Sequence, residues 1–222
     1  MSIELVEFEG NSNIGLYSVS TDNFAIIPDS MPVKFANAIE RVLKVKTFSF
    51  TMDPSVIGAL IVVNRNGILL SSILSLDVEI AMKEQFPELI IQRFDFNYFA
   101  FGNLIVSTDK ITLISPMIPE KQRLIIENTF DTEIIITQLN NSDLVGSMIV
   151  TNSLGAVISP LVENEIQDIY DYLGVEKIEV STVNKGAHFP SSGIICNSKG
   201  ALLGKFSTGL ETIAITNALF PS

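Results

Sequence analysis

The sequence is short of the residues that build disulfides, metal sites and nucleic-acid contacts. Among 222 residues it has one cysteine, one histidine and no tryptophan. A single cysteine cannot form an internal disulfide, and nothing pairs it as a metal site. Lys and Arg number only 14 against 25 Asp and Glu, which gives a net charge of −11. A protein that mainly contacts phosphates normally carries a basic face, so we do not expect DNA or naked RNA as its primary partner.

Long hydrophobic runs are absent as well. The apolar stretch Ile57–Val63 ends after about seven residues at Asn64-Arg65, whereas a membrane span needs about 20. No basic region leads into an apolar one after Met1, so no signal peptide is expected. We therefore expect a cytoplasmic protein with no membrane, metal or cofactor. The acidity favours a basic protein surface as partner, although it is also compatible with a role in solubility alone.

A repeated unit dominates the rest of the sequence. Four glycines each open an apolar run, at intervals of 43, 44 and 44 residues: Gly15, Gly58, Gly102 and Gly146. A fifth run follows Ser191, and each run ends in a turn rich in Asn, Asp or Gly, as a short hairpin loop requires. We predict one domain (1–222) of five repeats, at about 15–57, 58–101, 102–145, 146–190 and 191–222.

Each repeat reads as strand, turn, second strand, helix and third strand. Helices are predicted at about 33–44, 76–86, 119–130, 162–173 and after Thr208, where Thr208 and Glu211 fit a capping box. The fifth repeat lacks a third strand, but residues 3–8 alternate apolar and acidic side chains at the other end of the chain. We predict that this N-terminal strand completes the last repeat and closes a ring, with first strands inside, helices outside and no sheet edge exposed.

This α/β ring of strand–strand–helix–strand repeats is similar to the pentein fold, a five-fold pseudosymmetric α-β propeller. Short motifs narrow the resemblance to the archaeal and eukaryotic translation initiation factor six family over essentially the whole chain. The motifs are Phe101-Gly102-Asn103, Val145-Gly146-Ser147, Thr151-Asn152, Thr182–Gly186, Asn197–Gly200 and Thr208–Glu211. Ser159-Pro160 and Ser207-Thr208 depart from the family's usual His-Pro and Thr-Thr, which puts only local contacts in doubt.

The resemblance implies a factor that binds the large ribosomal subunit and prevents its association with the small subunit. Such a factor attaches mainly to a ribosomal protein near the sarcin–ricin loop, with rRNA contacts secondary, and it acts by occupying space. It needs no catalytic residue, and we expect a monomer. The family pattern nominates Asn103 as a ribosome contact, and repeat position adds Leu16, Ala59 and Ser147, all expected where first strands begin.

The alternative is a guanidine-modifying hydrolase or transferase, because other penteins use a nucleophilic cysteine with a histidine. Cys196 lies in an apolar run, where a buried structural thiol is the ordinary interpretation. His188 lies in a loop, where a solvated side chain is expected. We therefore predict a non-enzymatic protein. A run of aromatic residues from Phe94 to Phe101 is expected to be mostly core, with a partner-contact patch as the alternative.

Overall fold

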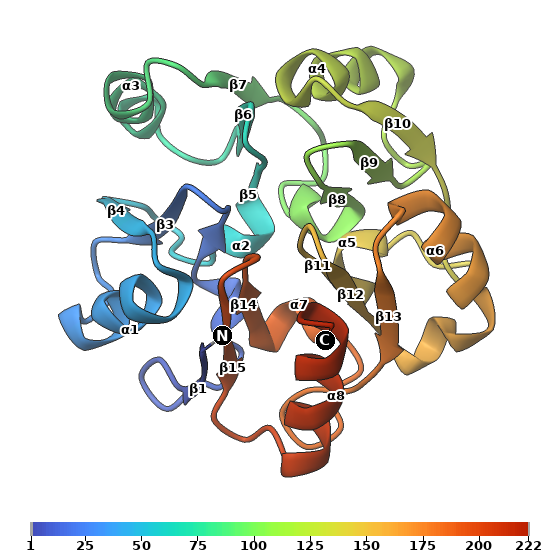
Figure 1. The fold of residues 1–222 in the computed structure, drawn as a ribbon. Coiled ribbons are helices and arrows are strands. Elements are labelled where there is room, and N and C mark those ends of the chain that lie inside the picture. The colour runs from blue at the N-terminus through green and yellow to red at the C-terminus, as the bar shows by residue number, and fades with distance from the viewer. Residues whose placement is uncertain (1, 222) are drawn as a thin grey trace.

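The computed structural model describes residues 2–221, and their strands and helices surround a central axis (Figure 1). Each of five sheets has a first strand beside the axis, a second in the middle and a third outside. The first strands are β2 (Val19–Ser20), β5 (Ile61–Val63), β8 (Ile105–Ser107), β11 (Ile149–Thr151) and β14 (Ile194–Cys196). The second strands are β3 (Phe24–Pro28), β6 (Gly67–Ser71), β9 (Ile111–Ile114), β12 (Gly155–Ile158) and β15 (Gly200–Gly204). The third strands are β4 (Lys46–Phe50), β7 (Ile90–Phe94), β10 (Glu133–Ile136), β13 (Lys177–Val180) and β1 (Ser2–Val6).

In every sheet the first strand is antiparallel to the second, and the second is parallel to the third. The fifth sheet takes its third strand from the other end of the chain. Here β1 pairs with β15 in parallel, with Ile3 opposite Ala201 and Leu5 opposite Leu203. The predicted α/β architecture, in which the N-terminal strand completes the last repeat, is confirmed.

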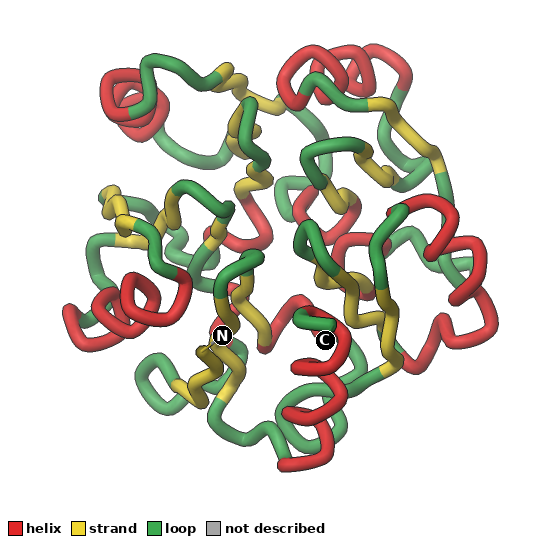
Figure 2. Tube along the Cα trace, viewed as in Figure 1, coloured by secondary structure: helices red, strands yellow, loops and turns green. Residues whose placement is uncertain are grey.

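The longer helices form the outer ring (Figure 2). They are α1 (Val33–Leu43), α3 (Leu76–Gln85), α4 (Glu120–Phe130), η3 (Pro160–Glu165) continuing into α6 (Ile166–Leu173), and α8 (Gly209–Leu219). Capping residues fix the ends of two of them. The α6 helix ends at Gly174, whose φ of 57° is a left-handed conformation that glycine adopts without steric cost. The predicted capping box at the start of α8 is present, with Thr208 and Glu211 each satisfying a backbone N–H of the other.

The hydrophobic core lies between sheets and helices and is shared by neighbouring repeats. Phe86, at the end of α3 in the second repeat, packs on Phe24 and Phe48 of the first, with ring centroids 4.8 Å apart in both pairs. Val106 and Leu113 of the third repeat likewise lie in one cluster with Ile149 and Ile158 of the fourth. Each repeat therefore buries its apolar surface against the next, as stacked repeat units do.

Two expectations about the strands are wrong. The glycines do not open the first strands, because each lies in a short helical turn before the strand: η1 (Ile14–Leu16), α2 (Ile57–Leu60), η2 (Phe101–Leu104), α5 (Val145–Met148) and, for the fifth repeat, α7 (Pro190–Gly193). Ring closure also leaves sheet edges, since each sheet of the described chain has three strands and first strands of neighbouring sheets do not pair. The first strands have only two or three residues, too few to build a ladder around the axis.

We propose that the five repeats behave as one domain, and deletion of residues 1–8 tests this. The deletion removes β1 and buried Phe8, so we expect a single unfolding transition of the whole ring at lower denaturant concentration. Loss of one buried large apolar side chain and of a paired strand should together lower the free energy of unfolding by at least about 3 kcal/mol. Leu5→Ser, at a half-exposed position of the same strand, should cost much less. Two separate transitions, or an unchanged midpoint, would contradict the proposal.

Candidate interaction surface

The ring has two different ends. At one end lie the five short helical turns, together with the ends of the second strands and the starts of the outer helices. The backbone N–H groups of Ser115 and Ser159, just after β9 and β12, donate to the carbonyls of Leu104 and Met148 in these turns. We call this end the glycine-ring face. At the opposite end lie the hairpin turns between first and second strands, and we call it the hairpin end.

Backbone packs on backbone at the centre of the glycine-ring face. A Cβ placed on Gly58 would lie 2.0 Å from the carbonyl oxygen of Gly15, and one on Gly146 would lie 2.1 Å from that of Gly102. A Cβ on Gly102 would lie 2.6 Å from the Gly58 carbonyl oxygen. No side chain fits at such distances, so these positions require glycine for space rather than for an unusual φ. The ring closes through Ser191, whose carbonyl oxygen lies 2.0 Å from a Cβ built on Gly15.

The four residues predicted to contact a partner gather around this centre, one from each of four repeats. They follow the glycines within the helical turns, rather than lying at strand starts as expected: Leu16, Ala59, Asn103 and Ser147. Three of them are half-buried, but Ser147 is buried. Ser147 instead donates its hydroxyl to Asn103 Oδ1 at 3.1 Å, and its carbonyl accepts from Ser191 Oγ at 3.1 Å. These two hydrogen bonds orient the Asn103 side chain and connect the helical turns of the third, fourth and fifth repeats.

Exposed apolar side chains surround the same centre, and the sequence analysis did not single most of them out. Four lie in the first turns of outer helices: Val33, Leu76, Leu161 and Leu210. Others lie in the loops that enter the outer helices or the helical turns: Ile73, Tyr98, Phe99, Leu144, Phe189 and Phe206. The repeat pattern could have revealed them, because four of the five outer helices have an aliphatic residue at their first or second position that does not enter the core. Leu210 is 82% exposed.

The aromatic run between the second and third repeats divides between core and surface. Phe94, Phe96 and Phe101 are buried, whereas Tyr98 and Phe99 are 53% and 49% exposed. The expectation of core is therefore right for three side chains, and the two exposed ones lie on the glycine-ring face. Asp53, Asp77 and Asp95, all exposed, lie in or beside loops of the same end. This face thus combines apolar side chains with charged ones of both signs, because Lys34 and Lys185 are also exposed at this end.

One loop of this face is held by a buried carboxylate. The Glu211 side chain accepts hydrogen bonds from Thr182 Oγ1 at 2.6 Å and from the backbone N–H groups of Thr208, Gly186 and Lys185 at 2.7, 2.9 and 3.1 Å. Burial by itself would raise the pKa of Glu211, but these four hydrogen bonds outweigh it and lower the pKa to about 2. Glu211 therefore fixes the loop that leads into α7 against the start of α8.

Cys196 and His188 do not meet. Cys196 lies at the hairpin end of β14, where its thiol faces the Thr151 carbonyl at 3.9 Å. His188 is exposed in the loop before α7, at the glycine-ring face. Cys196 is half-buried, and desolvation, with a smaller contribution from the charge of Asp22, raises the pKa of its thiol to about 12. A thiol with this pKa is almost entirely protonated at neutral pH and is a poor nucleophile.

Residues 2–221 contain neither a cluster suited to a metal ion nor a helix suited to a membrane. No group of three or more His, Cys, Asp or Glu side chains is placed to hold a metal ion there. Within the same range, the helices are all too short or too polar to cross a membrane.

Comparison with known proteins gives matches along nearly the whole chain. The model of the eIF-6 family matches residues 3–218. Translation initiation factor 6 of Methanocaldococcus jannaschii is 32% identical over 218 residues, which cover 96% of this chain and 95% of that protein. Translation initiation factor 6 of Pyrobaculum aerophilum is 29% identical over 212 residues, 95% of each chain. The protein of the same name from Thermococcus onnurineus is 30% identical over 226 residues, which cover 99% of this chain and 98% of that one.

Replacement of Glu211 tests its role in the fold. Glu211→Gln removes a charged acceptor of four hydrogen bonds, so we expect a loss on the order of 2 kcal/mol in the free energy of unfolding near neutral pH. The folded pKa of about 2 lies below the ordinary value of 4.5. The stabilisation is therefore full above about pH 4.5 and is lost as pH falls toward 2. Denaturant unfolding across this range should show the two proteins converging in acid. Glu84→Gln, at an exposed position, is the control, and a pH-independent difference would exclude the carboxylate as the cause.

Replacement of Cys196 tests the alternative of a guanidine-modifying enzyme. Because the thiol is protonated and has no histidine beside it, we expect no hydrolysis of arginine or agmatine by the wild-type protein. Cys196→Ser should have an unfolding midpoint close to wild type. Turnover that is present in the wild type and abolished in the variant would restore the enzymatic interpretation.

Proposed function

The chain belongs to the eIF-6 family, and on this premise we propose that it is a translation factor that binds the large ribosomal subunit and keeps the small subunit from joining. The observation that carries this proposal is the full-length match to proteins named translation initiation factor 6. In this proposal the protein acts as a monomer without a cofactor. Occupying the intersubunit face, near the sarcin–ricin loop, is sufficient to exclude the other subunit.

We assign the binding surface to the glycine-ring face. Among residues 2–221, most of the exposed large apolar side chains lie around this end, and apolar exposure that gathers on one face is typical of protein-binding surfaces. Asn103 lies near the centre, half-buried, with its side chain oriented by Ser147. The Asn103 side chain is half-buried and has apolar residues around it, so we expect it to lose its remaining water when the partner binds.

Charge supports a ribosomal protein as the main attachment point. The net charge of −11 disfavours extensive contact with phosphates, so rRNA contacts are secondary in the proposal. Salt should weaken the complex only as far as ion pairs at the interface contribute. It should not produce the steep salt dependence that follows when a protein displaces counterions from many phosphates.

The rigidity of this face suits a mechanism based on shape. The close backbone packing leaves no room for a side chain between the helical turns, which favours a surface that is already formed before the partner arrives. A preformed surface pays little ordering entropy on binding. The factor can therefore act as a fixed obstacle, which requires no chemical step.

Asn103→Arg tests the assigned face. A long charged side chain at a packed, central position should exclude the partner and weaken binding to purified large subunits at least about tenfold, or 1.4 kcal/mol. Asn128→Arg is the matched control, because Asn128 is exposed at the far end of α4, toward the hairpin end. Binding is measured by cosedimentation with large subunits, and function by the yield of joined ribosomes when factor is in excess.

If Asn128→Arg weakens binding to large subunits and Asn103→Arg binds like the wild type, the wrong face is assigned. If wild-type protein neither binds large subunits nor lowers the yield of joined ribosomes, the function itself is wrong. Binding to isolated rRNA as tight as binding to whole subunits would contradict the charge argument.

A further inference from the structure

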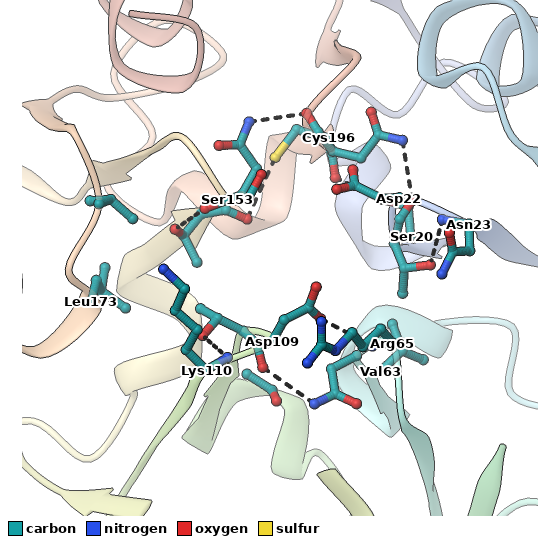
Figure 3. A pocket seen from close by; sticks show the side chains of 18 of the residues that line it. Ser20, Asp22, Asn23, Val63, Arg65, Asp109, Lys110, Ser153, Leu173 and Cys196 are labelled. Atoms are coloured by element: carbon teal, nitrogen blue, oxygen red, sulfur yellow. Dashed lines mark hydrogen bonds between the residues drawn. The ribbon is translucent and has the colours of Figure 1, made fainter. Parts of the chain in front are cut away.

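The hairpin end contains a cavity that the proposed function does not use. Its volume is about 350 Å³, and residues of all five repeats line it (Figure 3). Its walls are formed by the hairpin turns and by the start of the segment after α6. It lies on the axis at the end opposite the glycine-ring face, so a molecule bound here would not compete with a partner on that face.

The turns that line the cavity are held in place by asparagine side chains. Asn64 Nδ2 donates to the carbonyls of Thr108 in the next turn and Phe130 at the end of α4, at 3.2 and 2.9 Å. Asn152 and Asn197 repeat this arrangement two and three junctions further around the ring. The cavity is therefore a built feature of the fold, with walls fixed by buried hydrogen bonds.

Charged groups of both signs extend toward the opening. Asp22 and Asp109 each use Oδ1 to accept a backbone N–H from a neighbouring turn, of Ser198 at 2.8 Å and of Arg65 at 3.2 Å. Among the described residues no donor reaches the second oxygen of either carboxylate. In the same part of the chain, the Lys110 ammonium and the Arg65 guanidinium have no carboxylate oxygen within 4.0 Å. Figure 3 shows Lys110 and Asp109 together on one side of the opening and Asp22 on another.

The distribution of charge disfavours a ligand of only one sign. A simple anion would meet Lys110 but also Asp22 and Asp109. Outside the cavity, a groove that Lys110 and Arg65 also border carries further carboxylates, at Glu88, Glu127, Asp131 and Glu133. A simple cation would meet the aspartates but also Lys110. Only a molecule with both charges places each beside its opposite.

The remaining wall of the cavity is apolar. Val63, Leu173 and Val175 line it, and Leu173 lies on the side of Lys110 in Figure 3. An aliphatic group placed against these side chains would lose contact with water and gain stability in proportion to its area.

We propose that this axial cavity binds a small zwitterion with an aliphatic part, such as a free aliphatic amino acid. Lys110 pairs with its carboxylate, Asp22 and Asp109 accept hydrogen bonds from its ammonium group, and its side chain packs on Leu173 and Val175. This inference is independent of ribosome binding, because it uses the opposite end of the ring.

Three matched probes test the proposal: L-leucine, leucinamide, which lacks the carboxylate, and N-acetyl-leucine, which lacks the ammonium group. Titration of each into the full-length protein is followed by the NMR shifts of backbone amides in the hairpin turns. We expect saturable shifts with leucine, and affinity at least about tenfold lower for each analogue. Lys110→Gln should weaken leucine binding by a similar factor. Lys34→Gln, exposed near the start of α1 at the opposite end, should leave it unchanged.

The outcomes separate the alternatives. If titration with leucine gives no saturable shifts, or shifts amides outside the hairpin turns instead, the proposal is overturned. If leucinamide binds with the same affinity as leucine, the site selects cations only. If N-acetyl-leucine binds with the same affinity as leucine, the site selects anions only. Either result excludes a zwitterion site. Equal leucine affinity in Lys110→Gln and wild type would also exclude it. Large-subunit binding by Lys110→Gln should stay at the wild-type level, so failure here and failure of the proposed function are distinguishable.

Discussion

The close approach of backbone turns at the axis is the constraint on which the rest of this structure depends. Gly15, Gly58, Gly102 and Gly146 let each helical turn pack against the carbonyl of its neighbour, at distances that leave no room for a Cβ. This packing holds the five helical turns together at the axis. The outer helices then fill the wedges between sheets, so that core clusters join adjacent repeats. A larger side chain at the centre would have to displace several repeats together.

The same constraint explains why the two ends of the ring differ. At the glycine-ring face the turns converge until only backbone remains at the centre, and side chains spread outward over the starts of the helices. At the hairpin end the turns stay apart, and asparagine side chains bridge the space between them while a cavity remains on the axis. A broad surface with apolar side chains suits a macromolecular partner, and an axial cavity lined by charged and apolar side chains suits a small molecule.

Stability and function are connected at Glu211. Its carboxylate belongs to the capping box of α8 and also holds the loop before α7, which forms part of the glycine-ring face. The proposed binding surface is thus fixed by groups that also stabilise the fold. Rigidity of this kind has a physical use in a factor that acts by excluding another body, because no binding energy is spent on ordering loops.

The sequence by itself determined the repeat, the order of strands and helices, the helix caps and the use of the N-terminal strand in the last sheet. These follow from local signals, such as the periodic spacing of glycines and turn residues and the Thr208–Glu211 pair, which need no distant contact to be read. Only the tertiary structure decided that the glycines lie in helical turns, because that depends on how closely five segments of the chain approach one another at the axis. It also decided that Ser147 is buried while Tyr98 and Phe99 are exposed, and that Lys110, Asp22 and Asp109 share one cavity. Burial and convergence depend on packing between repeats far apart in the chain, and no local pattern of residues encodes that packing.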